Sequence, residues 1–157
     1  MKHRLKLILS LCLGAVLLGL SVWFSSMEAY DSRFISMNIA IFLRNRFFPG
    51  IPLLQLHNLV RQWAHILVFF FVTLAVCFIL DCFPHKKILL PLGMAFCFAY
   101  ARFDEWKKVF FPSRHDDFYD VVRNWKGVTA GILLFLAIKA IAAGVRRLSR
   151  RLQKSGH

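Results

Sequence analysis

Acidic residues are scarce in this sequence. The 157 residues include 8 Asp and Glu against 21 Lys and Arg, which gives a formal net charge of +13 at pH 7. An excess of this kind is one mark of nucleic acid binding, but here the basic residues gather at the ends of apolar runs, where they contact anionic lipid headgroups. We therefore expect a lipid partner and no nucleic acid.

The cysteine patterns of a disulfide framework or a zinc site are also missing. No CxxC pair occurs among Cys12, Cys77, Cys82 and Cys97, and no His stands at ligand spacing from them. Three of the four fall inside apolar runs, and Cys82 lies at the edge of one, so reduced and packed thiols are predicted. Internal repeats and low-complexity segments are absent as well, and the length fits one domain, 1–157.

Apolar residues are abundant. They make up 58% of the chain, with 17 Phe and a mean hydropathy of +0.56, too many for a soluble domain of this size. Most of the apolar surface must face lipid, which predicts an all-α integral membrane protein.

Four apolar runs are long enough to cross a bilayer, at about 7–24, 63–83, 88–104 and 121–145. The first follows a basic N-terminal stretch, as a signal peptide does, but no well-placed small residues follow it for cleavage, so we expect it to remain as a span. Lys139 lies inside the fourth run, from which its side chain can snorkel to the membrane surface.

The segment 25–62 is of mixed character and contains the breakers Pro49-Gly50 and Pro52. Its two apolar stretches, 37–43 and 51–59, are too short to span. They are apolar enough to lie in the headgroup region as interfacial helical segments. The alternative is a loop that folds over the outer ends of the spans.

Four spans place both termini on one side of the membrane. The side with the termini and the other side carry ten Lys and Arg each, so the count alone decides nothing. The basic residues on the side of the termini sit in short segments directly against the spans. This density predicts cytoplasmic N and C termini in a multi-pass protein of the cell membrane, with 25–62 and 105–124 outside.

Polar chemistry is concentrated in the segment 100–131, which holds five of the eight acidic residues. With the topology above, candidate catalytic residues from three segments meet near the outer surface, namely His65, Asp104, Glu105 and Asp120. Ionisable groups at this depth are costly unless paired, so the group is a candidate site. The alternative is a structural set of salt bridges and helix caps, with Asp120 capping the fourth span and Arg114 pairing with Glu105.

Basic and amide side chains near the same surface are candidates for ligand binding. They are Arg61, Lys107, Lys108, Arg114 and Asn124, and Arg in particular offers planar, bidentate donors to phosphate. Metal binding by His65 with Glu105 and Asp120 has suitable residue types but no supporting short-range spacing, so neither a metal nor a cofactor is expected.

Small and polar residues follow one another at helical spacing at the start of the fourth span. Asp120, Asn124, Gly127 and Gly131 recur at four, three and four residues, which places them on one face of a helix. Gly127 and Gly131 form a small-xxx-small pattern, which predicts close packing against another helix.

Several of these segments resemble the VanZ-like family of bacterial membrane proteins. The similar stretches are AYARFDEWKKVFFPSR and DVVRNWKGVTAG, with weaker similarity in LVRQWAH and FSSMEAYDS. The resemblance places the family's polar positions on Arg61, His65, Asp104, Glu105, Arg114, Asp120, Asn124 and Gly127. Lys107 and Lys108 stand where the family has His and then Gln, and Ser113 replaces a Gly, which puts a proton-carrying role of that His in doubt here.

The resemblance implies a role in teicoplanin-type glycopeptide susceptibility in the bacterial envelope. We expect a protein that binds an anionic lipid or a lipid-linked cell-wall precursor at the outer membrane face. The alternatives are a membrane-embedded enzyme that acts on lipid-linked phosphate or peptide bonds with a carboxylate, His and Arg site, and a scaffold for other envelope proteins.

Overall fold

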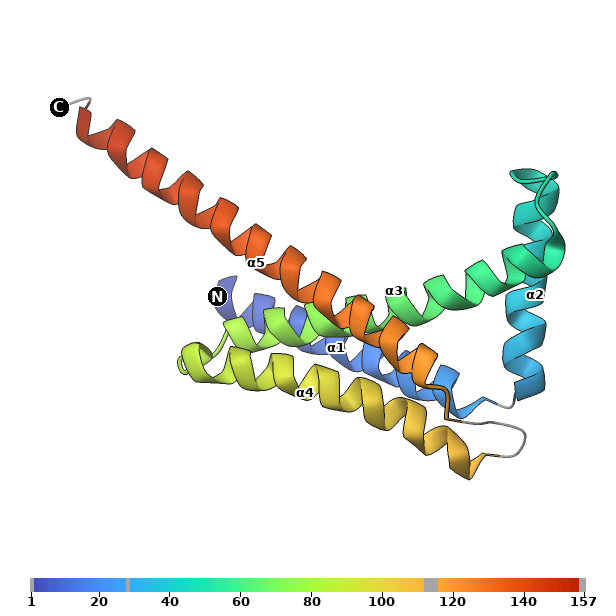
Figure 1. Cartoon of the computed structure of the whole chain (residues 1–157). Helices are drawn as coiled ribbons and strands as arrows, with labels where there is room; N and C mark the ends of the chain where they lie inside the picture. The colour runs from blue at the N-terminus through green and yellow to red at the C-terminus, as the bar shows by residue number, and fades with distance from the viewer. Residues whose placement is uncertain (1, 28, 112–115, 156–157) are drawn as a thin grey trace.

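A computed structural model of the chain describes residues 2–27, 29–111 and 116–155, and within these ranges every regular element is helical. The elements are α1 (Lys2–Ser26), α2 (Ala29–Arg46), α3 (Leu53–Asp81), α4 (Lys86–Trp106), the short 3₁₀ helix η1 (Lys107–Phe110) and α5 (Phe118–Ser155) (Figure 1). The prediction of an all-α protein is confirmed.

The helix α3 lies at the centre and packs against α1, α2, α4 and α5. A core of Phe69, Cys97, Ala101 and Val128 joins α3, α4 and α5. The start of α1, the α3–α4 turn and the end of α5 lie toward one end of the bundle, and α2 and the α4–α5 connection lie at the other (Figure 1). Chain segments far apart in sequence therefore meet at both ends.

The contact between α3 and α5 depends on two glycines. A Cβ on Gly127 would collide with the backbone carbonyl oxygen of Ile66, and one on Gly131 would lie 2.8 Å from the carbonyl oxygen of Phe70. Only a residue without a side chain lets the backbones approach so closely. The predicted close packing through Gly127 and Gly131 is confirmed.

The surface of the bundle is rich in large apolar side chains, including Leu67, Phe71, Leu92, Phe96 and Leu133. Of the described helices, α3 and α5 are long and apolar enough to cross a membrane. The described cysteines are all free, and Cys77 and Cys97 are buried as expected, whereas Cys12 is exposed and the prediction of a packed thiol is wrong there.

The first connecting region differs from its expected form. The stretch 37–43 belongs to the longer helix α2, so the alternative of a loop is wrong for most of this region. The stretch 51–59 is not a separate interfacial segment, because Pro52 occupies the N-cap and α3 runs without a break from Leu53 to Asp81. No Gly or Pro interrupts 53–81, so the polar residues before position 63 continue the same helix.

Candidate functional site

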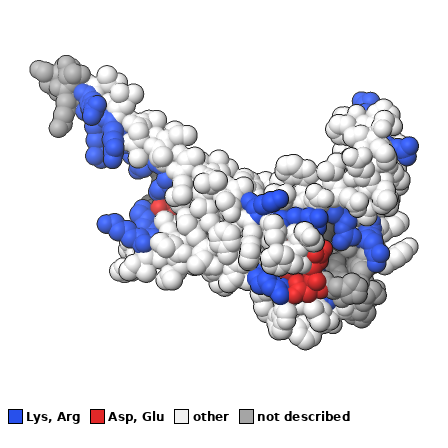
Figure 2. Space-filling model, in the orientation of Figure 1, with Lys and Arg blue, Asp and Glu red and all other residues white. Residues whose placement is uncertain are grey.

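Side chains from three helices converge at the end of the bundle next to the α4–α5 connection. One ligand-type atom each from His65 on α3, Glu105 on α4 and Asp120 on α5 lie within 4.8 Å of one another. Figure 2 shows acidic atoms flanked by basic atoms at this end of the molecule. We call the side chains that meet around His65, Glu105 and Asp120 the polar cluster. It consists of His65, Asp104, Glu105, Lys107, Lys108, Asp120, Arg123 and Asn124.

The ring of His65 is held on both sides. Its Nδ1 lies 3.0 Å from Oδ1 of Asn124 and its Nε2 lies 3.2 Å from Oδ2 of Asp120. The amide nitrogen of Asn124 donates to the carbonyl oxygen of Ala101 at 3.5 Å, which turns the amide oxygen toward the ring. Both ring nitrogens therefore face acceptors, and a protonated ring donates to both.

Asp120 is the carboxylate that links the cluster together. Besides His65, its Oδ1 accepts a hydrogen bond from Nη1 of Arg123, and its Oδ2 lies 3.9 Å from Nζ of Lys108. Burial on its own raises the pKa of Asp120, but the hydrogen bond and charge of His65, followed by Arg123 and Lys108, hold this pKa well below its usual range. The Asp120 side chain is thus a carboxylate.

Glu105 is the most deeply buried carboxyl group of the cluster, with 1% of its surface exposed. Its Oε2 accepts from Nζ of Lys108 at 2.5 Å. Burial raises the pKa of Glu105 above its ordinary value, and the charge of Lys108 opposes that rise. The pKa values of two neighbouring carboxyl groups are therefore shifted in opposite directions: that of Glu105 is raised and that of Asp120 is lowered.

The two lysines after α4 are engaged by the acidic pair before them. Nζ of Lys107 lies 3.1 Å from Oδ1 of Asp104, and Lys108 pairs with Glu105, both at a spacing of three residues. Residues three apart are neighbours on a helix surface, so the end of α4 and the start of η1 bring these side chains together. Lys107 and Lys108 thus neutralise the carboxylates of Asp104 and Glu105. Because of these ion pairs, the two lysines are less free to bind a ligand than the sequence alone indicated.

Two other acidic residues, Asp116 and Asp117, lie directly before α5 and have partners of their own. Arg102 donates to both carboxylate oxygens of Asp116, at 2.9 and 2.6 Å. The carboxylate of Asp117 accepts the backbone N–H of Tyr119 at 2.9 Å and so caps α5. The alternative in which Asp120 caps this helix is wrong on that point, because Asp120 lies further inside α5 and reaches His65.

Among the predicted ligand-binding residues, Arg114 lies outside the described residues. Arg61 is half-buried on α3, one turn before His65, and no ion pair joins it to a carboxylate in the parts of the chain that the structure describes. Asn124 is fully buried and holds His65. Of the predicted ligand-binding cations that the structure describes, Arg61 is therefore the one that is not paired with a carboxylate.

Two contacts in and near the candidate site were not predicted from the sequence, namely the ion pair of Arg123 with Asp120 and the hydrogen bond of His57. Arg123 follows Asp120 at a spacing of three residues on a helix, a pattern typical of an ion pair. His57 on α3 lies 2.8 Å, through Nε2, from the hydroxyl oxygen of Ser36 on α2. His57 precedes Arg61 by one turn, as Arg61 precedes His65, and this repeated spacing is the signal that would have extended the polar face of α3.

The cluster suits a metal ion poorly despite its His and carboxylate groups. A divalent cation bound between Glu105, Asp120 and His65 would have to displace the ammonium of Lys108 and compete with the guanidinium of Arg123. The protein's own cations already balance the carboxylates, and this supports the expectation of no metal.

Access to the cluster is limited to its edge. A shallow groove of about 490 Å³ lies on the first turns of α3 and contains none of the cluster residues, being lined by Pro52, Leu54, Gln55, Asn58, Leu59 and Gln62. Within the cluster the side chains of Arg123, His65 and Lys107 keep 29, 20 and 16% of their surface exposed. A ligand at this site therefore meets cations and an imidazole before it meets carboxylates.

No protein-family model, curated protein or solved structure matches this chain.

Proposed function

We propose that the chain is a multi-pass membrane protein whose bundle crosses the bilayer between two polar levels. One level is the polar cluster, and the other is Asp81, which pairs with Lys139 at 2.6 Å and Lys86 at 3.3 Å. Asp120 and Lys139 are separated by 139 − 120 = 19 residues of α5, which corresponds to a rise of about 28 Å. This rise is close to the ~30 Å thickness of the hydrocarbon core. Arg123 and Lys126 lie in the outer part of this stretch and are not buried, so their long side chains are proposed to snorkel to the outer surface.

The surface between the two levels supports this placement. The stretches 66–80, 88–101 and 127–138 carry no charged residue, and their large apolar side chains, such as Phe71, Phe96 and Leu133, are exposed. The helix α1, which packs against α3, is proposed to cross the bilayer together with α3, α4 and α5. Dense basic residues at the end that carries both termini favour cytoplasmic termini and an outer position for the polar cluster.

At its outer end the protein is proposed to bind the phosphate of an anionic lipid or a lipid-linked cell-wall precursor. The observation that carries this is the exposed edge of the cluster, where buried carboxylates hold cations in fixed positions. Nη1 of Arg123 is bonded to Asp120, which leaves further guanidinium N–H groups for a phosphate. Arg61 adds a second cation one turn from His65, and the resemblance to the VanZ-like family extends the proposal to glycopeptide susceptibility.

The test is lipid binding by the full chain in nanodiscs. We expect a preference for phosphatidylglycerol over phosphatidylcholine that weakens with salt. Arg123→Gln should reduce this preference by roughly tenfold or more, because a hydrogen bond to a charged group contributes about 1.5–3 kcal/mol. The matched control is Lys126→Gln, which removes the same charge from an exposed position on the same helix. Equal effects of the two substitutions would reject a specific site in favour of general attraction.

A membrane-embedded enzyme is the second candidate, and the opposite pKa shifts of Glu105 and Asp120 favour it. Glu105, Asp120 and His65 offer groups of different proton affinity within 4.8 Å of one another, as an acid–base pair requires. Incubation of lipid-linked precursors with the protein, followed by mass spectrometry, separates the two functions. A new product that disappears in Glu105→Gln would establish the enzyme, and unchanged precursor that stays bound would support binding alone.

A further inference from the structure

The helix α5 continues well past the inner polar level. Lys139 lies at the α3–α4 turn, because it shares the carboxylate of Asp81 with Lys86. The remaining residues 140–155, which we call the α5 tail, stay helical and extend beyond the end of the bundle for about 24 Å (Figure 1). The tail therefore leaves the proposed hydrocarbon layer as a continuous helix.

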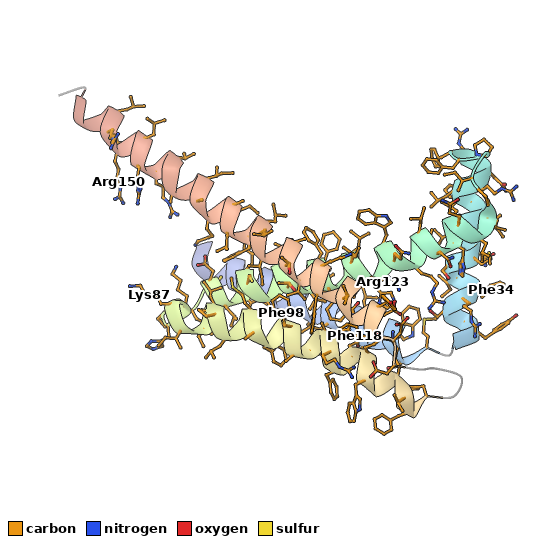
Figure 3. The ribbon with its side chains drawn as sticks, in the orientation of Figure 1. Phe34, Lys87, Phe98, Phe118, Arg123 and Arg150 are labelled. Carbon is orange, nitrogen blue, oxygen red and sulfur yellow. The ribbon has the colours of Figure 1, made fainter. Side chains whose placement is uncertain are left out.

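Positive charge on the tail has no acidic counterpart within the tail. The sequence has no Asp or Glu after Asp120, and the tail carries the exposed residues Arg146, Arg147, Arg150 and Arg151. Basic atoms appear both on the tail and at the neighbouring end of the bundle (Figure 2), where Arg150 and Lys87 mark the two positions (Figure 3). Two separate segments thus present cations at the same end of the molecule.

An apolar stripe runs along the tail beside these arginines. Ile141, Val145, Leu148 and Leu152 recur at spacings of four, three and four residues, and between 60 and 67% of each is exposed. These spacings place the four side chains on one face, while the arginines at 146, 147, 150 and 151 fall on the others. A helix with an apolar face and a basic face is typical of segments that lie at a membrane surface.

We propose that the α5 tail binds the anionic lipid surface of the leaflet from which α5 emerges. The arginines and Lys86 and Lys87 contact lipid phosphates. The tail continues α5 without a break, so for the stripe to enter the boundary between headgroups and acyl chains the helix must bend toward the surface, and Gly144, which nothing packs against, is the position proposed for this bend. A second copy of the tail is a poorer occupant, because pairing along the stripe would bring together eight arginines with no acid in either tail. The inference concerns the opposite end of the molecule from the polar cluster, and it rests only on the membrane insertion within the proposed function.

The test follows a fluorescent probe on the tail of the full chain in vesicles. An environment-sensitive dye is attached at Leu148→Cys, after Cys12 and Cys82 are changed to Ser to remove accessible thiols. The vesicles contain phosphatidylcholine alone or equal parts of phosphatidylcholine and phosphatidylglycerol. We expect blue-shifted emission and protection from iodide only in the mixed vesicles, with reversal by salt. A second probe at Leu133→Cys, between the two polar levels, reports insertion and should be protected in both.

The charge dependence is measured with Arg147→Gln and Arg150→Gln. Each substitution should weaken the affinity of the tail for the anionic surface roughly fivefold. The fraction of probe that is protected from iodide should fall accordingly. A Leu148 probe that stays open to iodide in mixed vesicles, while the Leu133 probe is protected, would overturn the inference and leave the membrane placement intact. Protection that follows protein concentration instead of phosphatidylglycerol would overturn it in favour of a second copy. A Leu133 probe open to iodide would refute the membrane insertion itself.

Discussion

Substitution of Gly127 by Ala addresses the contact that assembles the polar cluster. The added Cβ would overlap the carbonyl oxygen of Ile66, which belongs to the backbone of α3 and cannot rotate away. The helices must therefore separate near this point. Asn124 lies one turn before Gly127, and its 3.0 Å hydrogen bond to His65 crosses the same interface, so the separation should break that bond as well.

The size of the effect follows from three contributions. Overpacking of a close contact costs about 1–3 kcal/mol, and the loss of the bond between His65 and Asn124 adds about 1 kcal/mol. Ala is the better helix former by about 1 kcal/mol, which offsets part of the loss. A net destabilisation of about 1–3 kcal/mol corresponds to a fall in Tm of roughly 3–10 °C for a chain of this size.

Thermal unfolding of the purified protein in detergent measures this fall. Gly144→Ala is the matched control, because a Cβ there meets no atom within 4 Å and should leave Tm unchanged or raise it. Gly131→Ala should also lower Tm, since its Cβ would lie 2.8 Å from the carbonyl oxygen of Phe70. If Gly127→Ala were as stable as Gly144→Ala, the close approach of α3 and α5 would not contribute to stability.

Three further predictions concern charge and topology. The lowered pKa of Asp120 means that its carboxylate stabilises the fold above the ordinary pKa of Asp and that this contribution is lost as pH falls below about 4. Asp120→Asn should therefore be less stable at neutral pH and lose less on acidification, and parallel unfolding curves across a pH series would contradict this. Asp81→Asn removes the negative charge that two lysines share, whereas Lys139→Met removes one ion pair and costs about 1 kcal/mol. Asp81→Asn should therefore lower Tm more than Lys139→Met, and the reverse order in a thermal scan would count against the ion-pair account. An impermeant thiol reagent applied to intact cells should label a Cys at the exposed position Tyr119 and spare one at Ser149, and the opposite pattern would place the polar cluster in the cytoplasm.

Some of the site was accessible from the sequence because helical spacing fixes which residues share a face. The spacing of Asp120, Asn124, Gly127 and Gly131 placed them together, and the structure buries all four against α3. The individual pairings were not accessible, because they depend on how each helix is rotated about its axis. Nothing local indicates that Asp120 meets His65, 55 positions away (120 − 65).

The extent of the helices was harder to predict than their existence. Four polar residues lower the mean hydropathy before position 63, namely Gln55, His57, Asn58 and Arg61. A search for apolar runs therefore starts the helix too late. Helix continuity depends instead on breakers, and none occurs between Leu53 and Asp81. The pairing of Lys139 with Asp81 was also not predicted. A lysine inside an apolar run can snorkel to the surface or pair with a distant carboxylate, and the sequence does not distinguish the two.

The N-terminal part of α3, from Leu53 to His65, is a rigid extension of the helix. From His65 back to Leu53 it rises about 18 Å, and α2 packs against this extension, with Ser36 bonded to His57. Because no Gly or Pro softens the segment, a tilt of α3 by about ten degrees at the level of His65 would carry α2 sideways by roughly 3 Å. The extension is thus a rigid arm, and through it a small rearrangement around Arg61 and His65 would become a larger displacement of α2.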